Sequence, residues 1–400
     1  MNAFGIIAEY NPLHGGHTHL MDTLRRSHGN CAIVCAMSGD FVQRGDFALL
    51  RRHARAEAAV KSGADLVLEL PLPWAVSSAE GFAAGGVETL LATGIVDTIA
   101  FGSECGNGSA LMQVAQASLD DRFPALLKQE LSAGDSFAAA RQRAISTMIG
   151  VEDAAMLAQP NNTLGIEYCK AVLAQKRHAD ILTIPRIGSA HDSPDVSAYP
   201  SASAIRTLLQ SGKRAEALSC MAPAMKEVYL REESAGRAPV FAAHCQQAIL
   251  ARLRSMKEAD FSRLDEGGEG LGNRLFKTSR TLPNVESILE QAKTKRYPMA
   301  RLRRMVLWAY LGIEPAARPA HVPYLRVLAC NERGRTLLAQ MRKTADLPVI
   351  TKPADIRTLH PEAITLFEQE ARAADLYTLA YPDLAAAEGR KLWTEGPVIL

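Results

Sequence analysis

The sequence predicts an α/β protein, with a Rossmann-like parallel sheet followed by a mainly helical C-terminal region. From the N-terminus to about residue 210, short apolar segments alternate with helical patterns of about ten to fifteen residues, which is typical of βαβ units. Beyond about residue 211 the alternation stops and long helical patterns dominate. Glycines and polar residues follow several apolar segments, as they do at the edge where open parallel sheets bind ligands.

The predicted strands of the first half are apolar runs that end at glycine, proline or polar residues, and they cover residues 3–9, 31–37, 66–70, 98–101 and 180–184. Apolar residues at helical spacing predict helices over residues 16–27, 53–62, 78–91 and 203–209, with a helical insertion over 108–158. The second half predicts helices over residues 213–235, 242–259, 283–293 and 299–312, then a strand–helix unit over 324–330 and 333–342. We therefore predict an N-terminal domain of residues 1–210 and a helical region of residues 211–400.

Composition excludes several classes of protein. The hydrophobic content of 48% and charged content of 22% are ordinary for a soluble globular protein. No apolar run approaches the ~20 residues that a membrane span needs, and the first residues lack the basic start of a signal peptide. Seven cysteines without a C-x-x-C pair indicate neither a disulfide framework nor a zinc site. We expect a cytoplasmic protein without a protein-bound metal cluster.

Charge is distributed unevenly between the two halves. Residues 1–210 hold 16 Lys and Arg against 21 Asp and Glu, whereas residues 211–400 hold 29 against 22. A basic second half is typical of a region that meets a polyanion, although a solvated basic surface explains the charge equally well.

The most specific motif lies near the N-terminus. An apolar run ends at Asn11-Pro12, and His14 and His17 then flank a glycine pair at the predicted start of a helix. The backbone N–H groups and dipole of a helix start bind phosphate, and two imidazoles three residues apart add hydrogen-bond donors over the same turn. The pattern indicates chemistry at a nucleotide phosphate; the alternative is a surface loop with two unrelated histidines.

Further polar segments follow the other predicted strands. The loop of residues 37–46 offers an acid, an amide and a guanidinium between glycines, which suits a small polar substrate but also an ordinary loop. Gly102 lets the backbone approach a flat ligand closely. One of Asn161 and Asn162 either binds a ligand or caps the following helix. Ser201 and Ser203 begin a helix that carries Arg206 one turn later, and together they offer hydroxyls, N–H groups and a guanidinium to phosphate.

A basic cluster lies in the second half. Residues 294–304 contain five Lys and Arg residues and Tyr297. Helical spacing places Arg301 and Arg304 on one face. Such a cluster neutralises nucleic-acid phosphates, and a neighbouring tyrosine stacks on an unpaired base. A plain solvated helix face is the alternative.

These motifs resemble a known family. His14–His17 and Ser201–Arg206 resemble the H-x-G-H and I-S-S-T-x-I-R motifs of the nucleotidyltransferase superfamily. Further segments, Glu9–His17, Ser38–Gly45, Phe101–Glu104, Pro160–Tyr168 and Thr294–Tyr297, look like those of the tRNA(Met) cytidine acetate ligase family. The resemblance runs from Gly5 to about Arg342, which is most of the chain.

The resemblance implies an ATP-dependent ligase. Acetate attacks the α-phosphate of ATP to give acetyl-adenylate, and the N4 amine of the wobble cytidine of elongator tRNA(Met) takes the acetyl group, which gives N4-acetylcytidine. His14 and His17 are the implied catalytic residues. The implied ATP contacts are Ile7, Ala8, Glu9, Tyr10, Asn11, Pro12, Leu13, His14, Gly15, Gly16, His17, Thr18, His19, Leu20, Gly102, Asn162, Arg186, Ile187, Ser201, Ser203 and Arg206.

The remaining implied partners follow from the same resemblance. Ser38, Gly39 and Gln43 are expected to form the acetate pocket, and Lys295, Arg296, Arg301 and Arg304 to bind the tRNA backbone. Mg²⁺ is expected to arrive with the nucleotide, because no cage of carboxylates is visible. The chain departs from the family at Leu13, Gly15 and Asp40, where Phe, Asn and Asn are usual, and Asp40 is therefore not expected to contact acetate. Two alternatives stay open: a nucleotidyltransferase that acts on a small phosphorylated metabolite, and a non-catalytic RNA-binding protein.

Overall fold

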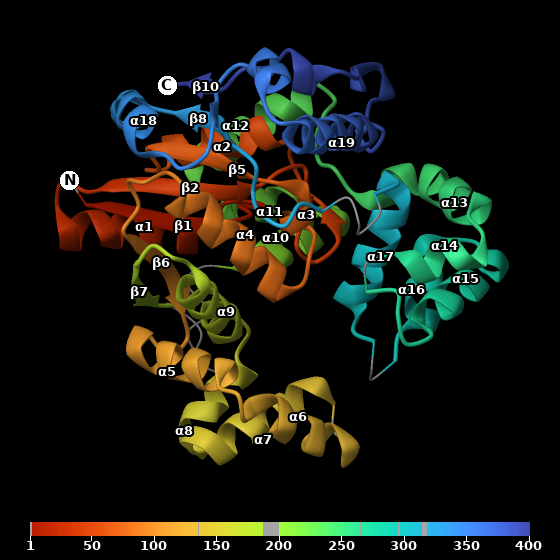
Figure 1. Cartoon of the computed structure of the whole chain (residues 1–400). Helices are drawn as coiled ribbons and strands as arrows, with labels where there is room; N and C mark the ends of the chain where they lie inside the picture. The colour runs from red at the N-terminus through yellow and green to blue at the C-terminus, as the bar shows by residue number, and fades with distance from the viewer. Residues whose placement is uncertain (1, 135, 187–199, 265, 295–296, 314–317) are drawn as a thin grey trace.

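A central sheet organises the molecule (Figure 1). The computed structural model describes residues 2–134, 136–186, 200–264, 266–294, 297–313 and 318–400. Its main sheet has the strand order β10-β8-β5-β2-β1-β6-β7, and β9 pairs with β8. The strands are β1 (Ala3–Ala8), β2 (Ala32–Ser38), β5 (Leu66–Leu70), β6 (Thr98–Ser103), β7 (Asp180–Pro185), β8 (Leu325–Cys330), β9 (Val349–Ile350) and β10 (Val398–Ile399). All pairings are parallel except that of β5 with β8.

The central strands are buried on both faces. Every residue of β1, β2 and β5 is buried, which explains why these segments are unbroken apolar runs in the sequence. The register of β1 against β2 runs from Ala3 opposite Ala32 to Ala8 opposite Met37, so the two strands end together. The five strands predicted in the first half are therefore present, with ends that differ by at most two residues.

Helices cover both faces of the sheet and produce two apolar cores. One core joins Ile7, Val34 and Leu68 to α4 and α9 and to the C-terminal helices. The other joins Phe4, Ile33 and Cys35 to α1, α2 and α12. These helices are α1 (Gly15–His28), α2 (Arg52–Lys61), α3 (Leu72–Ala75), α4 (Ala79–Leu91), α9 (Pro160–Ala174), α10 (Ala202–Gln210), α11 (Arg214–Cys220), α12 (Pro223–Ser234), α18 (Glu332–Thr344) and α19 (Pro361–Thr378).

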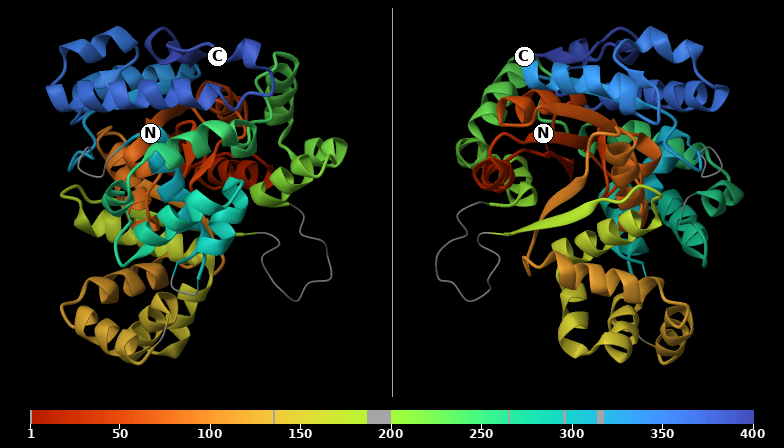
Figure 2. Two further views of the ribbon diagram at one scale, coloured as in Figure 1. Left: turned by 90° about the vertical axis from the view of Figure 1, so that its right-hand side faces the viewer. Right: turned by 60° about the vertical axis from the view of Figure 1, so that its left-hand side comes forward.

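Two groups of helices project from this body, and the two views of Figure 2 keep them apart from each other. The predicted insertion forms the lower group, with α5 (Gly108–Leu119), α6 (Phe123–Ser132), α7 (Phe137–Ile149), α8 (Val151–Ala154) and a 3-10 turn over Ala155–Ala158. The other group, on the right of Figure 1, contains α13 (Gln246–Ser255), α14 (Glu258–Arg263), α15 (Leu271–Thr281), α16 (Val285–Ala292) and α17 (Met299–Leu311). We call this second group the helical lobe. Further 3-10 turns cover Ala242–Cys245, Pro353–Thr358, Leu384–Ala386 and Lys391–Trp393.

The second half differs from its sequence prediction in four details. The helix expected over residues 242–259 divides into a 3-10 turn over Ala242–Cys245, α13 and α14, because the backbone is extended at Met256 and Lys257. The helix expected over residues 213–235 divides into α11 and α12, because Pro223 begins the second of them and cannot continue the first. Helix α15 follows the glycine-rich segment and had no counterpart in the prediction. β8 and β10 pair within the main sheet, so the sheet itself crosses the boundary proposed at residues 210 and 211.

A short hairpin that follows β2 packs between the sheet and the helical lobe. Its strands, β3 (Phe41–Val42) and β4 (Asp46–Phe47), form a separate antiparallel pair. Phe41 and Phe47 are buried in a third core, which contains residues of the helical lobe and the end of α19, and Tyr377 packs on both phenyl rings. The loop that follows β2 is therefore held between two parts of the fold.

Among the described residues, no helix has the length and apolar character required to cross a bilayer.

Candidate active site

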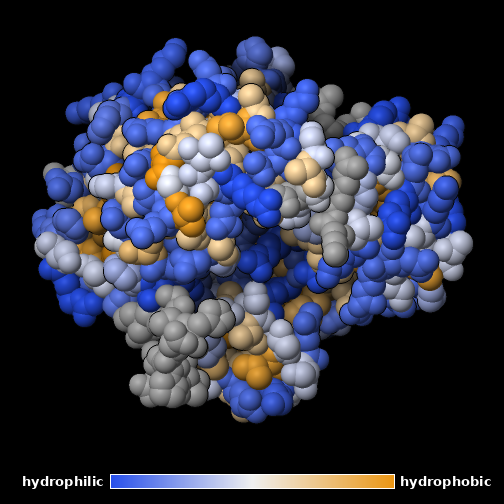
Figure 3. Space-filling model, turned by 90° about the horizontal axis from the view of Figure 1, so that it is seen from below, coloured by the Kyte–Doolittle hydropathy of each residue, from blue (hydrophilic) through white to orange (hydrophobic). Residues whose placement is uncertain are grey.

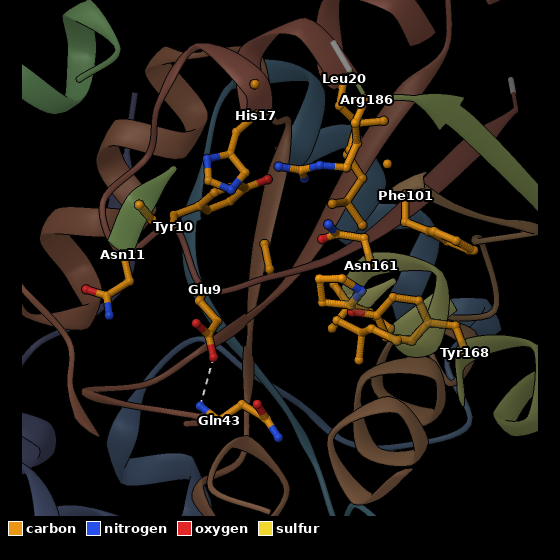
Figure 4. A pocket seen from close by; sticks show the side chains of 18 of the residues that line it. Glu9, Tyr10, Asn11, His17, Leu20, Gln43, Phe101, Asn161, Tyr168 and Arg186 are labelled. Carbon is orange, nitrogen blue, oxygen red and sulfur yellow. Dashed lines mark hydrogen bonds between the residues drawn. The ribbon is translucent and has the colours of Figure 1, made fainter. Parts of the chain in front are cut away.

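A crevice opens at the carboxyl ends of β1, β6 and β7, where open parallel sheets bind ligands. Its volume is about 360 Å³. Its lining comprises Ile6, Ile7, Ala8, Glu9, Tyr10, Asn11, His14, Gly16, His17, His19, Leu20, Gln43, Arg44, Ala79, Phe82, Phe101, Gly102, Pro160, Asn161, Thr163, Leu164, Tyr168, Ile184, Pro185, Arg186 and Ala202. Figure 4 shows side chains from the start of α1, from α9 and from the end of β7 pointing into the same space.

The two histidines form the N-terminal cap of α1. The Gly16 N–H donates to His14 Nδ1 over 3.1 Å, and the His14 N–H donates to His17 Nδ1 over 3.2 Å. The two rings are tilted by 36° with centroids 3.9 Å apart, and Tyr10 meets His17 edge-on. Because both Nδ1 atoms accept hydrogen bonds, the proton of each neutral ring is on Nε2. Each histidine therefore offers an Nε2–H donor.

Burial keeps both rings neutral. Burial and the neighbouring Arg186 lower the pKa of His14 to about 4. Burial, His14 and Arg186 lower the pKa of His17 well below its usual value. At neutral pH the pair thus donates hydrogen bonds without carrying charge. Arg186 supplies positive charge to the same crevice, and the start of α1 adds backbone N–H groups and the helix dipole. This combination suits the oxygens of a phosphate chain.

Tyr10 turns the chain between β1 and the histidines. Its φ of 47° lies in the left-handed region, which costs a residue other than glycine about 1–3 kcal/mol. Its side chain is 2% exposed, and its hydroxyl lies 3.3 Å from Cys35 Sγ in the core. The packing of Tyr10 therefore fixes a turn that local backbone preference opposes.

Glu9 lies in the middle of the crevice (Figure 4). Its Oε1 accepts the Gln43 N–H over 2.8 Å, and Gln43 Nε2 donates to the Ser77 carbonyl over 3.1 Å. Burial raises the pKa of Glu9 above its usual value, although the Gln43 N–H and nearby arginines lower it in part. Among the crevice residues given above, Glu9 is the sole carboxylate.

The loop after β2 contributes less to the crevice than predicted. Of the three expected acetate-pocket residues, Gln43 lines the crevice, whereas Ser38 and Gly39 do not. Ser38 is fully buried, and a Cβ on Gly39 would meet the Glu69 carboxylate at 2.6 Å. Asp40 faces Arg52, with Oδ2 and Nη2 2.6 Å apart. Burial opposes ionisation of Asp40, but Arg52 and Arg55 hold its pKa below the usual value.

Most of the N-terminal motif lies where it was expected. The expected ATP contacts that line the crevice are Ile7, Ala8, Glu9, Tyr10, Asn11, His14, Gly16, His17, His19, Leu20, Gly102 and Arg186. Those outside the lining are Pro12, Leu13, Gly15, Thr18, Asn162, Ser201, Ser203 and Arg206. Ile187 lies outside the described residues.

Two of the outlying residues have other partners. Asn162 is fully buried, and its Oδ1 accepts the N–H groups of Glu104 and Cys105 over 3.0 and 3.2 Å. Arg206 pairs with Asp46 over 2.6 Å and donates to Asn11 Oδ1 over 3.3 Å. Asn162 thus holds the loop after β6, and Arg206 holds the hairpin against the start of the crevice. Their contact with ATP stays a prediction.

Helix α9 provides crevice residues that the sequence analysis did not assign to ATP. Asn161, Leu164 and Tyr168 line the crevice, and they recur at helical spacing on one face of α9. That spacing was visible in the sequence and was the signal that could have found them. Phe101 packs edge-on against Tyr168. Ala79 and Phe82, from α4, and Arg44 from the hairpin also line the crevice, and the two α4 residues had no signal in the sequence.

The basic cluster on α17 is largely paired with acids. Arg304 forms two bonds with the Glu266 carboxylate, of 2.7 and 2.8 Å, and its side chain is 9% exposed. Arg301 donates to the Glu266 carbonyl over 2.8 Å and lies over the Tyr297 ring. Arg303 is exposed. Lys295 and Arg296 lie outside the described residues. Gly45 of the hairpin packs directly on the backbone of Arg304, because a Cβ there would lie 2.3 Å from the Arg304 nitrogen.

Comparison with known proteins decides the family. Residues 1–391 match the model of the HIGH Nucleotidyl Transferase family. The tRNA(Met) cytidine acetate ligase of Acetivibrio thermocellus is 33% identical over 100% of both chains. That of Caldanaerobacter subterraneus subsp. tengcongensis is 36% identical over 97% of this chain and 98% of its own. This chain belongs to the tRNA(Met) cytidine acetate ligase family of HIGH nucleotidyl transferases.

Solved structures agree with that membership. The crystal structure of Thermotoga maritima TmcAL bound with alpha-thio ATP superposes with a TM-score of 0.94 at 30% identity, and 100% of each chain is covered. An apo crystal form of the same protein gives a TM-score of 0.93. These matches confirm the predicted family, the α/β fold and the ligase class.

Proposed function

We propose that this protein activates acetate with ATP and acetylates N4 of the wobble cytidine of elongator tRNA(Met). The observation that carries the proposal is the crevice in which His14, His17 and Arg186 meet the start of α1. The names of the relatives and the alpha-thio ATP of the Thermotoga maritima structure support the same assignment.

In the first step, a carboxylate oxygen of acetate attacks the α-phosphorus of ATP, and pyrophosphate leaves. This displacement needs positioning and charge stabilisation rather than a protein nucleophile. The Nε2–H groups of His14 and His17 donate to phosphate oxygens as negative charge develops there, and Arg186 adds charge. Neutral donors in a buried site are stronger than the same donors in water.

The acceptor amine then attacks the acetyl carbon of acetyl-adenylate, and AMP leaves. Acetate has to lie beside the α-phosphate in the first step, and its acetyl group stays attached there for the second. Gln43 is the expected acetate-pocket residue that faces the crevice. Mg²⁺ bound with the nucleotide would supply positive charge that offsets the charge of the leaving pyrophosphate. The phosphates would supply most of its oxygen ligands, since Glu9 is the sole carboxylate among the described residues of the crevice lining.

The tRNA is proposed to lie along the N-terminal half of α17. The exposed Arg303 is available to backbone phosphates, whereas Arg301 is held by Glu266 and would exchange that contact for a phosphate. Lys295 and Arg296 precede both arginines in the chain. Arg304 is packed against the hairpin, so its contribution is to orient the hairpin and Glu266. Figure 3 shows hydrophilic side chains around a hollow between the helical lobe, on the right, and the rest of the molecule.

Mass spectrometry of elongator tRNA(Met) tests this function. The tRNA is incubated with the protein, ATP and isotopically labelled acetate, and we expect one labelled acetyl group at the wobble cytidine. Pyrophosphate release from ATP is measured in parallel, and we expect it to depend on acetate. Release that depends only on a phosphorylated metabolite indicates the rival nucleotidyltransferase, and RNA binding without any turnover indicates a non-catalytic protein.

A further inference from the structure

A proton has to be removed during acetyl transfer, and the residues proposed so far do not accept it. When the amine nitrogen bonds to the acetyl carbon, the bond from that carbon to the phosphate oxygen breaks and AMP leaves with the electron pair. The nitrogen begins with two protons and ends with one. Adenylate formation, in contrast, begins with a carboxylate anion and releases no proton. Only the second step therefore needs a base.

The two catalytic histidines are not available as that base. Both Nδ1 atoms already accept backbone N–H groups, and each Nε2 carries the remaining proton of the neutral ring. A lowered pKa also makes each ring a weak proton acceptor. The tyrosines of the crevice are poor bases for a different reason, because burial raises the pKa of both Tyr10 and Tyr168 and keeps them protonated.

We propose that Glu9 is the general base of the transfer step and receives the amine proton from the cytosine N4. This inference rests on the proposed function. Its Oε1 is fixed by the Gln43 N–H, whereas no hydrogen bond of its Oε2 is found among the described residues. A glutamate is also the side chain that accepts a hydrogen bond from the cytosine N4 amino group. Glu9 thus both orients the amine and takes its proton, which then passes to solvent.

The surroundings of Glu9 match this task. Burial raises the pKa of the carboxyl above its usual value, which makes it a stronger base than an exposed glutamate. The charged or titratable groups that act on it are Arg44 of the hairpin, Arg55 of α2, Arg206 of α10 and Tyr168 of α9. The three arginines oppose the effect of burial and lower the pKa of Glu9 in part. The Arg55 guanidinium also donates to the Glu9 carbonyl and fixes the backbone at this position.

The substitution Glu9→Gln separates the two steps. Glutamine keeps the volume and an oxygen for the Gln43 N–H, but it cannot accept a proton. Single-turnover rates are measured for acetyl-adenylate formation without tRNA, and for acetyl transfer to elongator tRNA(Met) from preformed acetyl-adenylate. We expect the ratio of transfer to adenylation to fall by about 10²–10⁴-fold relative to the wild type, which is the usual contribution of a general base.

The pH dependence of acetyl transfer distinguishes a general base from a residue with a purely structural role. Transfer by the wild type should fall as pH decreases through the pKa of Glu9, because only the carboxylate accepts a proton, and this acidic limb should be absent in Glu9→Gln. Glu80→Gln is the matched control: Glu80 is an exposed carboxylate on the first turn of α4, beside Ala79 of the crevice, and should retain the wild-type ratio and profile.

Several outcomes overturn the proposal. Equal losses in both steps would assign Glu9 to nucleotide binding. An acidic limb that persists in Glu9→Gln but disappears in His19→Gln would assign the base to His19, which also lines the crevice. Failure of the wild type to form acetyl-adenylate from acetate and ATP would instead reject the proposed function itself.

Discussion

The crevice at the end of β1 and the basic cluster on α17 were both predicted to bind phosphates. The two sites differ in whether their side chains are available to a ligand or are already paired within the protein. In the crevice, His14 and His17 use Nδ1 for local backbone bonds and present Nε2–H to the open space. On α17, the guanidiniums of Arg301 and Arg304 are directed to Glu266. The local capping motif therefore predicted the available hydrogen-bond donors better than the cluster of basic residues did.

The physical reason is the range of the interactions. The histidine cap joins residues two and three positions apart, so its geometry follows from the first turn of one helix. The partner of Arg304 is 38 residues away in the chain. Whether such a charge is free or neutralised depends on the packing of several helices. The following predictions test this contrast, from the largest expected effect to the smallest.

Replacement of His17 should have the largest effect. His17→Ala removes one Nε2–H donor and the acceptor for the His14 N–H. We expect acetyl-adenylate formation to slow by about 10²–10³-fold, as when one preorganised donor is removed from an active site. The rate is measured by acetate-dependent pyrophosphate release. His28→Ala, at the exposed end of the same helix, should keep the wild-type rate. A wild-type rate in His17→Ala would remove this histidine from the mechanism.

Replacement of Glu266 tests whether Arg304 of the basic cluster depends on its ion pair. Glu266→Ala leaves the largely buried Arg304 guanidinium without its carboxylate. We expect the free energy of unfolding in urea to fall by about 3 kcal/mol, at the lower end of the cost of breaking a buried pair. Glu258→Ala, an exposed glutamate on α14, should change it by less than about 0.5 kcal/mol. Equal stability of the two variants would indicate that Arg304 is not buried in solution.

Acid should destabilise the protein through the histidine cap. The pKa of His14 is about 4 in the fold, below the usual value of 6.5, so the unfolded chain binds more protons between these two values. The contribution is complete above pH 6.5 and is lost as pH falls through this window. We expect His14 to account for about 3 kcal/mol of that loss.

Urea unfolding at pH 6.5 and at pH 4 measures this acid effect. The matched variant is His14→Asn, because asparagine is also a good N-cap but does not titrate. Between pH 6.5 and pH 4, the free energy of unfolding of His14→Asn should fall by about 3 kcal/mol less than that of the wild type. Identical losses would show that His14 is not held neutral in the fold.

Replacement of the exposed arginine should have the smallest effect. Arg303→Ala removes one cation that is free to contact phosphate, and we expect the slope of log K against log salt for tRNA binding to decrease by about one. This slope is measured by filter binding at salt concentrations from about 50 to about 200 mM. Glu286→Gln, a change in the opposite direction on the neighbouring helix α16, controls for net charge. An unchanged slope in Arg303→Ala would place the tRNA elsewhere.

Much of the sheet was predictable, because β1, β2 and β5 are buried on both faces and appear as unbroken apolar runs. The pairing of β8 with β5 was not predictable, since an antiparallel strand more than 250 residues away leaves no local signal. The turn at His14 was predictable for the same reason as the sheet, since its contacts are local. The α9 wall with Asn161 and Tyr168 had a readable periodicity that was not used.

The sequence by itself determined the alternation of strands and helices in the first half, the capped turn at His14 and the family, because these depend on periodicity, capping and short motifs. Tertiary structure decided which charges remain available. In the folded structure Glu9 accepts the Gln43 N–H, and Asn162 accepts the Glu104 N–H of the loop after β6. Arg206 forms an ion pair with Asp46. Each of these contacts joins residues at least 34 positions apart, so only the packed fold could bring the partners within hydrogen-bond distance.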